Sequence, residues 1–222
     1  MKRIGCFHAH YSNIEHVEKA LSIFDVELIH FVDPGLDRIK QDADFTKEIV
    51  EKKVIETLDW IANCHVDAIL ITCTFFTALL NNEVHHYPIP IIKIDEPLFE
   101  EICEINQPII VAFTNPNTVN GTMNQILSYS RMKGKEIDAE PFLLENTFDL
   151  IMQGKKSEYI QSVSKGLISI IENNPKKSVV AAQLSMVPAA QLIENLRNIS
   201  IGNHLKSLSS YMEKVLSLVP KN

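Results

Sequence analysis

The segment Asp67-Ala68-Ile69-Leu70-Ile71-Thr72-Cys73-Thr74-Phe75-Phe76-Thr77-Ala78-Leu79-Leu80 decides how this sequence is interpreted. It begins with a continuous apolar run, which favours a parallel strand buried on both faces. Three polar residues centred on Cys73 then separate this run from a second apolar segment. We interpret the segment as a strand, a tight turn at Cys73 and a following helix.

Cys73 is a candidate functional residue because of its place at this turn. Ligands of open α/β sheets bind at the carboxyl ends of the strands. The N-terminus of a following helix presents unpaired N–H groups and the positive end of a dipole. Both features stabilise a bound carboxylate and favour a thiolate over a thiol. The alternative is that Cys73 is a small core residue, since free cysteines are among the most buried side chains.

The composition is that of a globular protein and argues against several functional classes. Of the 222 residues, 45% are hydrophobic and 22% are charged. These fractions are typical of globular domains. The net charge of −7 argues against a nucleic-acid partner, which needs a basic surface. No apolar run reaches the roughly 18 residues of a membrane helix, and the first residues are too polar for a signal peptide. We therefore expect a cytoplasmic protein with reduced thiols.

The four cysteines, Cys6, Cys64, Cys73 and Cys103, predict no metal site. None of them forms a CxxC motif, and no histidine cluster has the spacing of zinc ligands. The chain has only 7 glycines, and no glycine-rich loop follows a predicted strand, so a flavodoxin-type nucleotide binder is the weaker interpretation. We expect neither a metal nor an organic cofactor.

Strands alternate with helices along the whole chain. The predicted strands cover residues 3–7, 26–31, 68–71, 89–94, 109–113, 137–141, 178–183 and 199–201. Helical periodicity is present between them, as in the long stretch 42–64, and such alternation predicts doubly wound parallel sheets. Units of strand, polar turn and helix occur at His8 and Cys73, and again at Thr114 and Gln183. This pattern suggests two similar α/β halves.

Six segments of the chain carry a resemblance to a known family. They are Phe7-His8-Ala9, Ile71-Thr72-Cys73-Thr74, Ile94-Asp95-Glu96-Pro97, Ala112-Phe113-Thr114-Asn115-Pro116-Asn117-Thr118, Pro141-Phe142 and Ala182-Gln183-Leu184-Ser185-Met186. In order and spacing the chain resembles the aspartate/glutamate/hydantoin racemase superfamily, and most of all a branch known only as Asp/Glu racemase-like. The superfamily also includes arylmalonate decarboxylase and maleate isomerase.

The resemblance implies an α/β fold of two pseudo-symmetric flavodoxin-like halves. It also implies a parallel sheet in each half and a cofactor-free active-site cleft between the halves. We expect residues 1–97 plus 203–222 to form the first half and residues 98–202 to form the second. Dimers are common in the family, so a homodimer is a further expectation.

The chemistry that the resemblance implies uses two cysteines, which act on opposite faces of the substrate α-carbon. One removes the proton and the other returns it, which permits inversion although the proton is very weakly acidic. Cys73 matches the first cysteine. Gln183 matches the second, with Ser185 two residues later, and neither is a base near pH 7. The segment Phe7-His8 stands where glutamate racemases carry an aspartate or serine.

We assign expected roles to eight residues on this basis. Catalysis is assigned to Cys73 and His8, because the ordinary histidine pKa of about 6.5 suits proton transfer; a structural histidine bonded to a nearby carbonyl is the alternative. Substrate binding is assigned to hydroxyl and amide side chains that can hold a carboxylate. They are Thr74, Thr114, Asn117, Thr118, Gln183 and Ser185. Helix capping is the alternative role for the threonines and the asparagine. For Gln183 the alternative is that a glutamine at the end of a strand only satisfies the backbone of a loop.

The sequence therefore predicts a cofactor-independent racemase or isomerase that acts on a small carboxylate or amino-acid-like substrate through one cysteine. The alternative is a non-catalytic binding or sensor protein for small carboxylates, which the missing second cysteine suggests. In both cases the expected partner is a small-molecule carboxylate. Neither a nucleic acid nor a membrane is expected as a partner.

Overall fold

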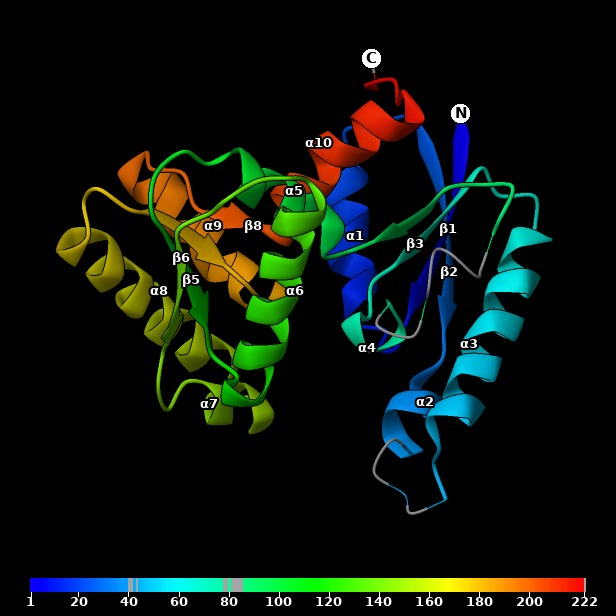
Figure 1. Ribbon diagram of the computed structural model, residues 1–222, viewed down its shortest axis with the longest axis horizontal. Helices are drawn as coiled ribbons and strands as arrows, with labels where there is room; N and C mark the ends of the chain where they lie inside the picture. Colours follow the sequence, from blue (N-terminus) through cyan, green and yellow to red (C-terminus); the bar gives the residue numbers. More distant parts are fainter. Residues whose placement is uncertain (40–41, 43, 78–79, 81–85, 222) are drawn as a thin grey trace. The chain divides into compact units, whose positions relative to one another are not determined.

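The computed structural model describes residues 1–39, 42, 44–77, 80 and 86–221, without the side chains of residues 37, 38, 47, 74 and 75. The chain divides into two compact units. One unit comprises Met1–Glu96 and Leu208–Asn222, and the other comprises Pro97–Ser207. Each is an α/β unit with its own sheet (Figure 1).

Each unit contains a four-stranded parallel sheet among its described residues. The first has β1 (Lys2–His8), β2 (Val26–Val32), β3 (Ala68–Ile71) and β4 (Ile91–Lys93), in the order β2-β1-β3-β4. The second has β5 (Ile109–Phe113), β6 (Ala139–Leu143), β7 (Ser178–Ala181) and β8 (Gly202–Asn203), in the order β6-β5-β7-β8. The two orders are the same when strands are counted from the start of each unit. The predicted α/β fold of two similar halves with parallel sheets is confirmed.

Helices form most of the connections between these strands. The first unit contains α1 (Asn13–Leu21), α2 (Pro34–Ile39), α3 (Lys47–Ala62) and α4 (Thr74–Thr77). The second contains α6 (Val119–Met132), α7 (Phe148–Met152), α8 (Lys156–Asn173) and α9 (Val187–Arg197), with 3₁₀ turns η1 (Pro116–Thr118) and η2 (Leu184–Met186). The helices α5 (Glu96–Glu104) and α10 (His204–Leu216) carry the chain from one unit to the other. No helix in the described ranges has both the length and the apolar content to cross a bilayer.

The first sheet is covered on both faces. In Figure 1, α1 and α3 lie on opposite sides of β1 and β2. The apolar stripe of α3 packs in one buried cluster with Phe7 of β1. Because successive strand residues point to opposite faces, Phe7 faces α3, whereas Cys6 and His8 face the side of α1. The position of a residue along β1 therefore decides which helix it meets.

The second sheet is covered in the same way. Val179 and Ala181 of β7 pack with Tyr159 of α8 in one buried cluster. The residue between them, Val180, packs in a second cluster with Ile126 of α6. The continuous apolar sequence of β7 is thus explained by burial on both faces.

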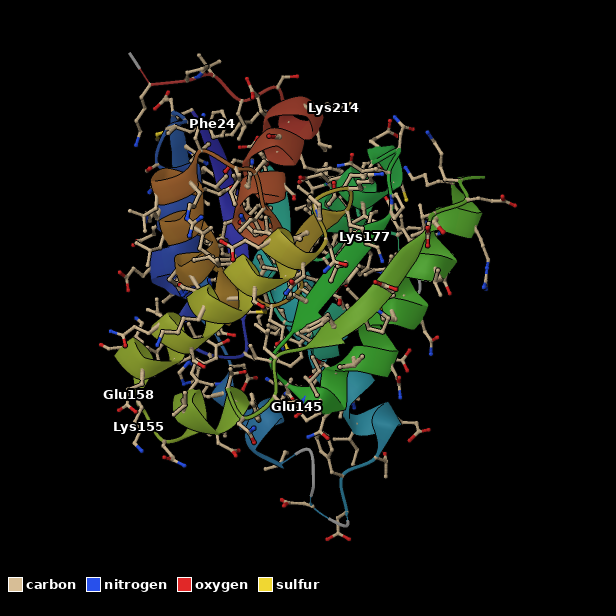
Figure 2. The ribbon with its side chains drawn as sticks, turned by 90° about the vertical axis from the view of Figure 1, so that its left-hand side faces the viewer. Phe24, Glu145, Lys155, Glu158, Lys177 and Lys214 are labelled. Atoms are coloured by element: carbon tan, nitrogen blue, oxygen red, sulfur yellow. The ribbon has the colours of Figure 1, made fainter. Side chains whose placement is uncertain are left out.

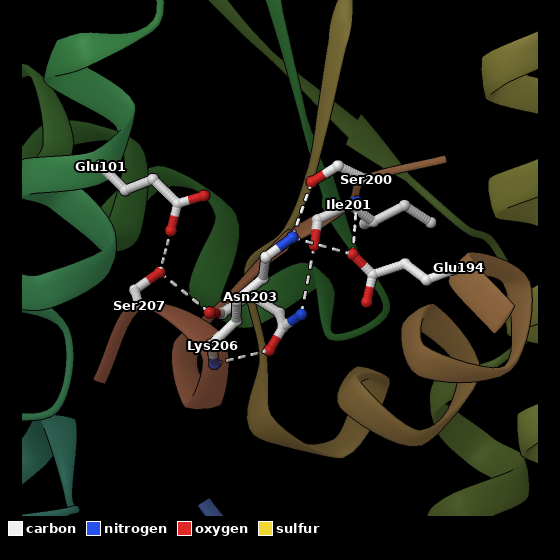
Figure 3. Close-up of polar contacts among 7 residues, drawn as sticks. All are labelled: Glu101, Glu194, Ser200, Ile201, Asn203, Lys206 and Ser207. Carbon is white, nitrogen blue, oxygen red and sulfur yellow. Dashed lines mark hydrogen bonds and ion pairs between the residues drawn. The ribbon is translucent and has the colours of Figure 1, made fainter. Parts of the chain in front are cut away.

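Polar contacts fix both edge strands of the second sheet. At one edge, Lys177 (labelled in Figure 2) forms an ion pair with Glu140 of β6, with 2.6 Å between Nζ and Oε1. At the other edge, Figure 3 shows the contacts around β8. The Ile201 N–H donates to Glu194 Oε1 at 2.9 Å, and Asn203 Nδ2 donates to the Ile201 carbonyl at 3.1 Å. Glu194 of α9 therefore fixes the backbone at Ile201, just before β8 begins.

The last strand lies later than predicted, at Gly202–Asn203 instead of residues 199–201. Asn198 ends α9 in the left-handed conformation, with φ 53°. The chain comes into register with Val180 of β7 only at Gly202. The apolar pattern of residues 199–201 reflects burial of Ile201 before the strand, and this misplaced the prediction.

The long predicted helix 42–64 begins later than expected. Its first residue is Lys47, because Thr46 has extended backbone and its Oγ1 accepts a hydrogen bond from the Ile49 N–H at 3.4 Å. This is the behaviour of a helix N-cap. A separate short helix, α2, occupies the segment after Asp33.

Close packing of α3 on β1 makes Gly5 a sensitive position. A Cβ atom at Gly5 would lie 2.5 Å from Cγ2 of the fully buried Ile61, whereas one at Gly121 of α6 would meet nothing within 4 Å. We expect Gly5→Ala to lower the free energy of unfolding by about 1–3 kcal/mol through overpacking. The matched Gly121→Ala should raise it by up to about 1 kcal/mol, because alanine is the better helix former. Urea unfolding of both variants tests this, and an unchanged midpoint for Gly5→Ala would contradict it.

Candidate active site

Cys73 lies at the carboxyl edge of the first sheet, two residues after β3. It is half-buried, whereas Cys6 and Cys103 are buried. The Thr77 N–H donates to the Cys73 carbonyl at 3.0 Å, so Cys73 begins the turn of α4. The side chain of Thr74, a predicted ligand of the substrate, lies outside the described residues. The predicted succession of strand, cysteine and helical turn is present.

The pairing of β1 with β3 places His8 beside Thr72, the residue before Cys73. Phe7 pairs with Ile71, so the next residues, His8 and Thr72, are neighbours. His8 Nδ1 lies 2.8 Å from Thr72 Oγ1. Both side chains are buried. Burial, and to a smaller extent the neighbouring His30, lower the pKa of His8 to about 4. His8 is therefore neutral at pH 7.

Two further residues surround the ring of His8. His8 Nε2 lies 2.9 Å from Nδ1 of His30 on β2. Cys6, two residues earlier on β1, is the register partner of His30. The potential metal-ligand atoms of Cys6, His8 and His30 all lie within 4.8 Å of one another. Cys6 and His30 were not among the predicted site residues, because their pairing depends on the register of β1 and β2, which leaves no local pattern in the sequence.

A second polar cluster surrounds Gln183, two residues after β7. Gln183 Oε1 accepts hydrogen bonds from the Thr114 N–H at 2.7 Å, the Asn115 N–H at 3.1 Å and Thr114 Oγ1 at 2.8 Å. Its Nε2 donates to Thr118 Oγ1 at 3.3 Å. Three donors at the end of β5 thus converge on one oxygen atom. We call the Thr114 N–H, the Asn115 N–H and the Thr114 hydroxyl the oxygen cradle.

The hydroxyl of Tyr159 extends this cluster. It lies 3.0 Å from Thr114 Oγ1 and 2.8 Å from Ser185 Oγ, and the tyrosine is fully buried. Burial raises the pKa of Tyr159, so it is a neutral hydrogen-bonding group. Tyr159 lies on α8 and was not predicted, because nothing in its local sequence indicates a role at the end of β5. The exposed Asn117 contributes its backbone N–H to the turn, donating to Asn115 Oδ1 at 3.0 Å.

Cys73 and Gln183 occupy equivalent positions in the two units. Each lies two residues beyond the third strand of its sheet. In the first unit, the pairing of Phe7 with Ile71 aligns Ala9 with Cys73. In the second, the pairing of Ala112 with Ala181 aligns Thr114 with Gln183. The first unit therefore presents a thiol where the second presents an amide bound in the oxygen cradle.

Comparison with known proteins identifies the fold. Neither a protein-family model nor a curated protein sequence matches the chain. Among solved structures, a glutamate racemase from Francisella tularensis, determined with D-glutamate, is 18% identical and has a TM-score of 0.65, covering 97% of this chain and 81% of its own.

Two further solved structures have the same fold. An aspartate racemase from Picrophilus torridus is 14% identical, with a TM-score of 0.65 over 100% of this chain and 96% of its own. An allantoin racemase from Klebsiella pneumoniae is 14% identical, with a TM-score of 0.71 over 98% of this chain and 88% of its own. Such identities carry the fold and not the reaction. The chain has the fold of these glutamate, aspartate and allantoin racemases.

Proposed function

We propose that the chain is a cofactor-independent isomerase of the racemase type, which acts at the α-carbon of a small carboxylate or amino-acid-like substrate. Cys73 is its proton carrier. The observation that carries the proposal is the oxygen cradle, in which three donors from Thr114 and Asn115 converge on Gln183 Oε1. The racemase names of the structural neighbours support the same reaction class.

The oxygen cradle suits the charge that this reaction develops. When a base removes a proton beside a carboxylate, the electron pair of the broken C–H bond moves onto the carboxylate oxygens. Fixed N–H and O–H donors stabilise such charge without having to reorganise. In the proposed complex, a substrate carboxylate oxygen takes the place of Gln183 Oε1 in the oxygen cradle. Ser185 supports the cradle through the Tyr159 hydroxyl, which also contacts Thr114 Oγ1. Thr118 accepts a hydrogen bond from Gln183 Nε2 while Gln183 occupies the cradle.

Cys73 supplies the base in this proposal. Its thiolate forms an S–H bond as the substrate C–H bond breaks. Gln183, at the equivalent position of the second unit, does not titrate. A water molecule therefore protonates the opposite face of the carbanion. The hydroxide that remains takes the proton of the Cys73 thiol, which restores the thiolate, so a single thiol serves the reaction.

His8 acts through Thr72 in this proposal. Both of its ring nitrogens lie within hydrogen-bonding distance of protein atoms, Thr72 Oγ1 and His30 Nδ1, and the side chain is fully buried. We therefore assign His8 the role of a positioning residue, which fixes the end of β3 from which Cys73 projects.

Exchange of the α-proton for deuterium tests the reaction itself. In D₂O, we expect the wild-type chain to exchange the α-proton of at least one member of a panel of amino acids, hydantoins and small dicarboxylates, followed by NMR. Cys73→Ala should lose about 10²–10⁴-fold of the rate, which is the usual contribution of a general base. The control Cys64→Ala removes a cysteine that is also half-buried and should keep the rate. Equal exchange by Cys73→Ala, or no exchange with the whole panel, would refute the proposal.

The reactivity of Cys73 can be measured without a substrate. We expect iodoacetamide at neutral pH to label Cys73 before the other cysteines, because a proton carrier must reach the thiolate form. Burial raises the pKa of Cys6 to about 12 and also raises that of Cys103, so both should label slowly. Cys64 is the informative comparison, since it is half-buried too. Mass spectrometry of labelled peptides gives the order, and labelling of Cys64 at the same rate would argue against an activated Cys73.

Removal of the Gln183 side chain tests the oxygen cradle. Gln183→Ala leaves the N–H groups of Thr114 and Asn115 without their acceptor. This should lower the free energy of unfolding by about 1–3 kcal/mol. We expect acetate or malonate to fill the vacated position and to raise the melting temperature of this variant more than that of the wild type. Gln161→Ala, at an exposed position of α8, is the control. Equal shifts in all three proteins would show that the cradle does not bind carboxylates.

A further inference from the structure

We propose that Cys6, His8 and His30 form a binding site for a first-row divalent cation, with Zn²⁺ the best match. The site lies within the first unit and does not depend on the proposed reaction. The sequence predicted no metal site, because the three residues have no recognised ligand spacing. The paired strands β1 and β2 bring them together.

The geometry of the strands directs all three side chains to one place. Cys6 and His8 are two residues apart on β1 and therefore share a face, and Cys6 pairs with His30 on the adjacent parallel strand. Their candidate ligand atoms lie within 4.8 Å of one another. Tetrahedral zinc with bonds of about 2.0–2.3 Å holds its ligand atoms roughly 3.3–3.7 Å apart. The two ring nitrogens, now 2.9 Å apart, need to separate by only a few tenths of an ångström.

The donor set fits a metal of intermediate softness. Thiolate and imidazole are the ligands that zinc prefers in proteins, whereas calcium and magnesium prefer oxygen ligands. Glu18 of α1 adds a carboxylate beside His30, with 3.7 Å between Oε1 and Nε2. Three protein ligands leave a fourth position for water.

The outer contacts of His8 already match those of a metal-bound histidine. Metal-bound histidines donate their second ring N–H to an oxygen acceptor, which fixes the tautomer. The Thr72 hydroxyl donates to the Phe7 carbonyl at 3.4 Å and accepts from Asn13 Nδ2 at 3.2 Å. His8 Nδ1, at 2.8 Å, is then the donor to Thr72 Oγ1. The lone pair of His8 Nε2 therefore faces Cys6 and His30.

His30 has a buried nitrogen that metal binding would satisfy. With the lone pair of His8 Nε2 directed at it, His30 Nδ1 has to be the donor when no metal is bound. His30 Nε2 is then an acceptor that faces the Glu18 carboxylate, and this buried atom has no hydrogen-bond partner among the described residues. A cation held by both facing nitrogens moves the hydrogen to Nε2, which can then donate toward Glu18.

The proton balance of binding follows from these tautomers. Each imidazole keeps one hydrogen, on Nδ1 of His8 and Nε2 of His30. The Cys6 thiol gives its proton to solvent as the metal–sulfur bond forms, so one proton leaves for each cation bound. Cys6 and His8 are fully buried, and the cation would enter beside the half-buried His30.

Cobalt spectroscopy of the whole chain tests the proposal. After removal of metals with EDTA, Co²⁺ should bind one ion per chain and produce a sulfur-to-cobalt charge-transfer absorption, which Zn²⁺ then abolishes. We expect Cys6→Ser to lose this absorption. The matched control Cys103→Ser removes a buried cysteine of the second unit and should keep it. No bound Co²⁺ or Zn²⁺ at micromolar concentration, or an undiminished absorption in Cys6→Ser, would overturn the proposal.

Two further variants guard against a failure of Cys6→Ser to fold. His30→Gln changes a half-buried ligand, and we expect it to abolish the rise in melting temperature that Zn²⁺ produces in the wild type. Glu18→Gln changes only an outer partner at an exposed position, and should weaken Zn²⁺ binding about 10–100-fold. An unchanged Zn²⁺-induced shift in His30→Gln would place the metal elsewhere and refute the site. Loss of α-proton exchange with metal binding intact would concern only the proposed function.

Discussion

The parallel pairing of β1 with both of its neighbours is the constraint on which the first unit depends. Pairing with β2 aligns Cys6 with His30, and pairing with β3 brings His8 beside Thr72. A shift of one residue in either register would turn these side chains to the face of α3. There they would meet the apolar cluster around Phe7, where a polar ring without hydrogen-bond partners is costly. The hydrophobic burial of alternate residues therefore holds the polar residues in place.

The second unit uses the same strand order with different chemistry. Its central strand β5 pairs with β7 so that Thr114 lies beside Gln183, as Ala9 lies beside Cys73 in the first unit. The side chain of Gln183 satisfies two backbone N–H groups at the end of β5. The fold thus fixes where functional groups stand, and the side chain at each position decides what they can do.

The features that were predictable from the sequence are local ones. Apolar runs and turn residues gave the strands and the turns at Cys73 and Gln183, because burial on two faces leaves a pattern within a few residues. The pairing of Cys6 with His30 and the contact of Tyr159 with Thr114 depend on register and on helix packing. Neither leaves a local pattern. The last strand was misplaced for a similar reason, since the left-handed Asn198 delays the chain before it reaches β7.

The oxygen cradle at the end of β5 and the thiol of Cys73 after β3 depend differently on the amino-acid sequence. Two donors of the oxygen cradle are backbone N–H groups, so they persist for as long as β5 and β7 keep their register, whatever side chain follows β7. A proton carrier depends on the identity of a single side chain, and one substitution removes it. The two backbone donors of the oxygen cradle therefore do not require a cysteine at position 183. Under the proposed function, the oxygen cradle needs only this register, whereas proton transfer needs the thiol of Cys73.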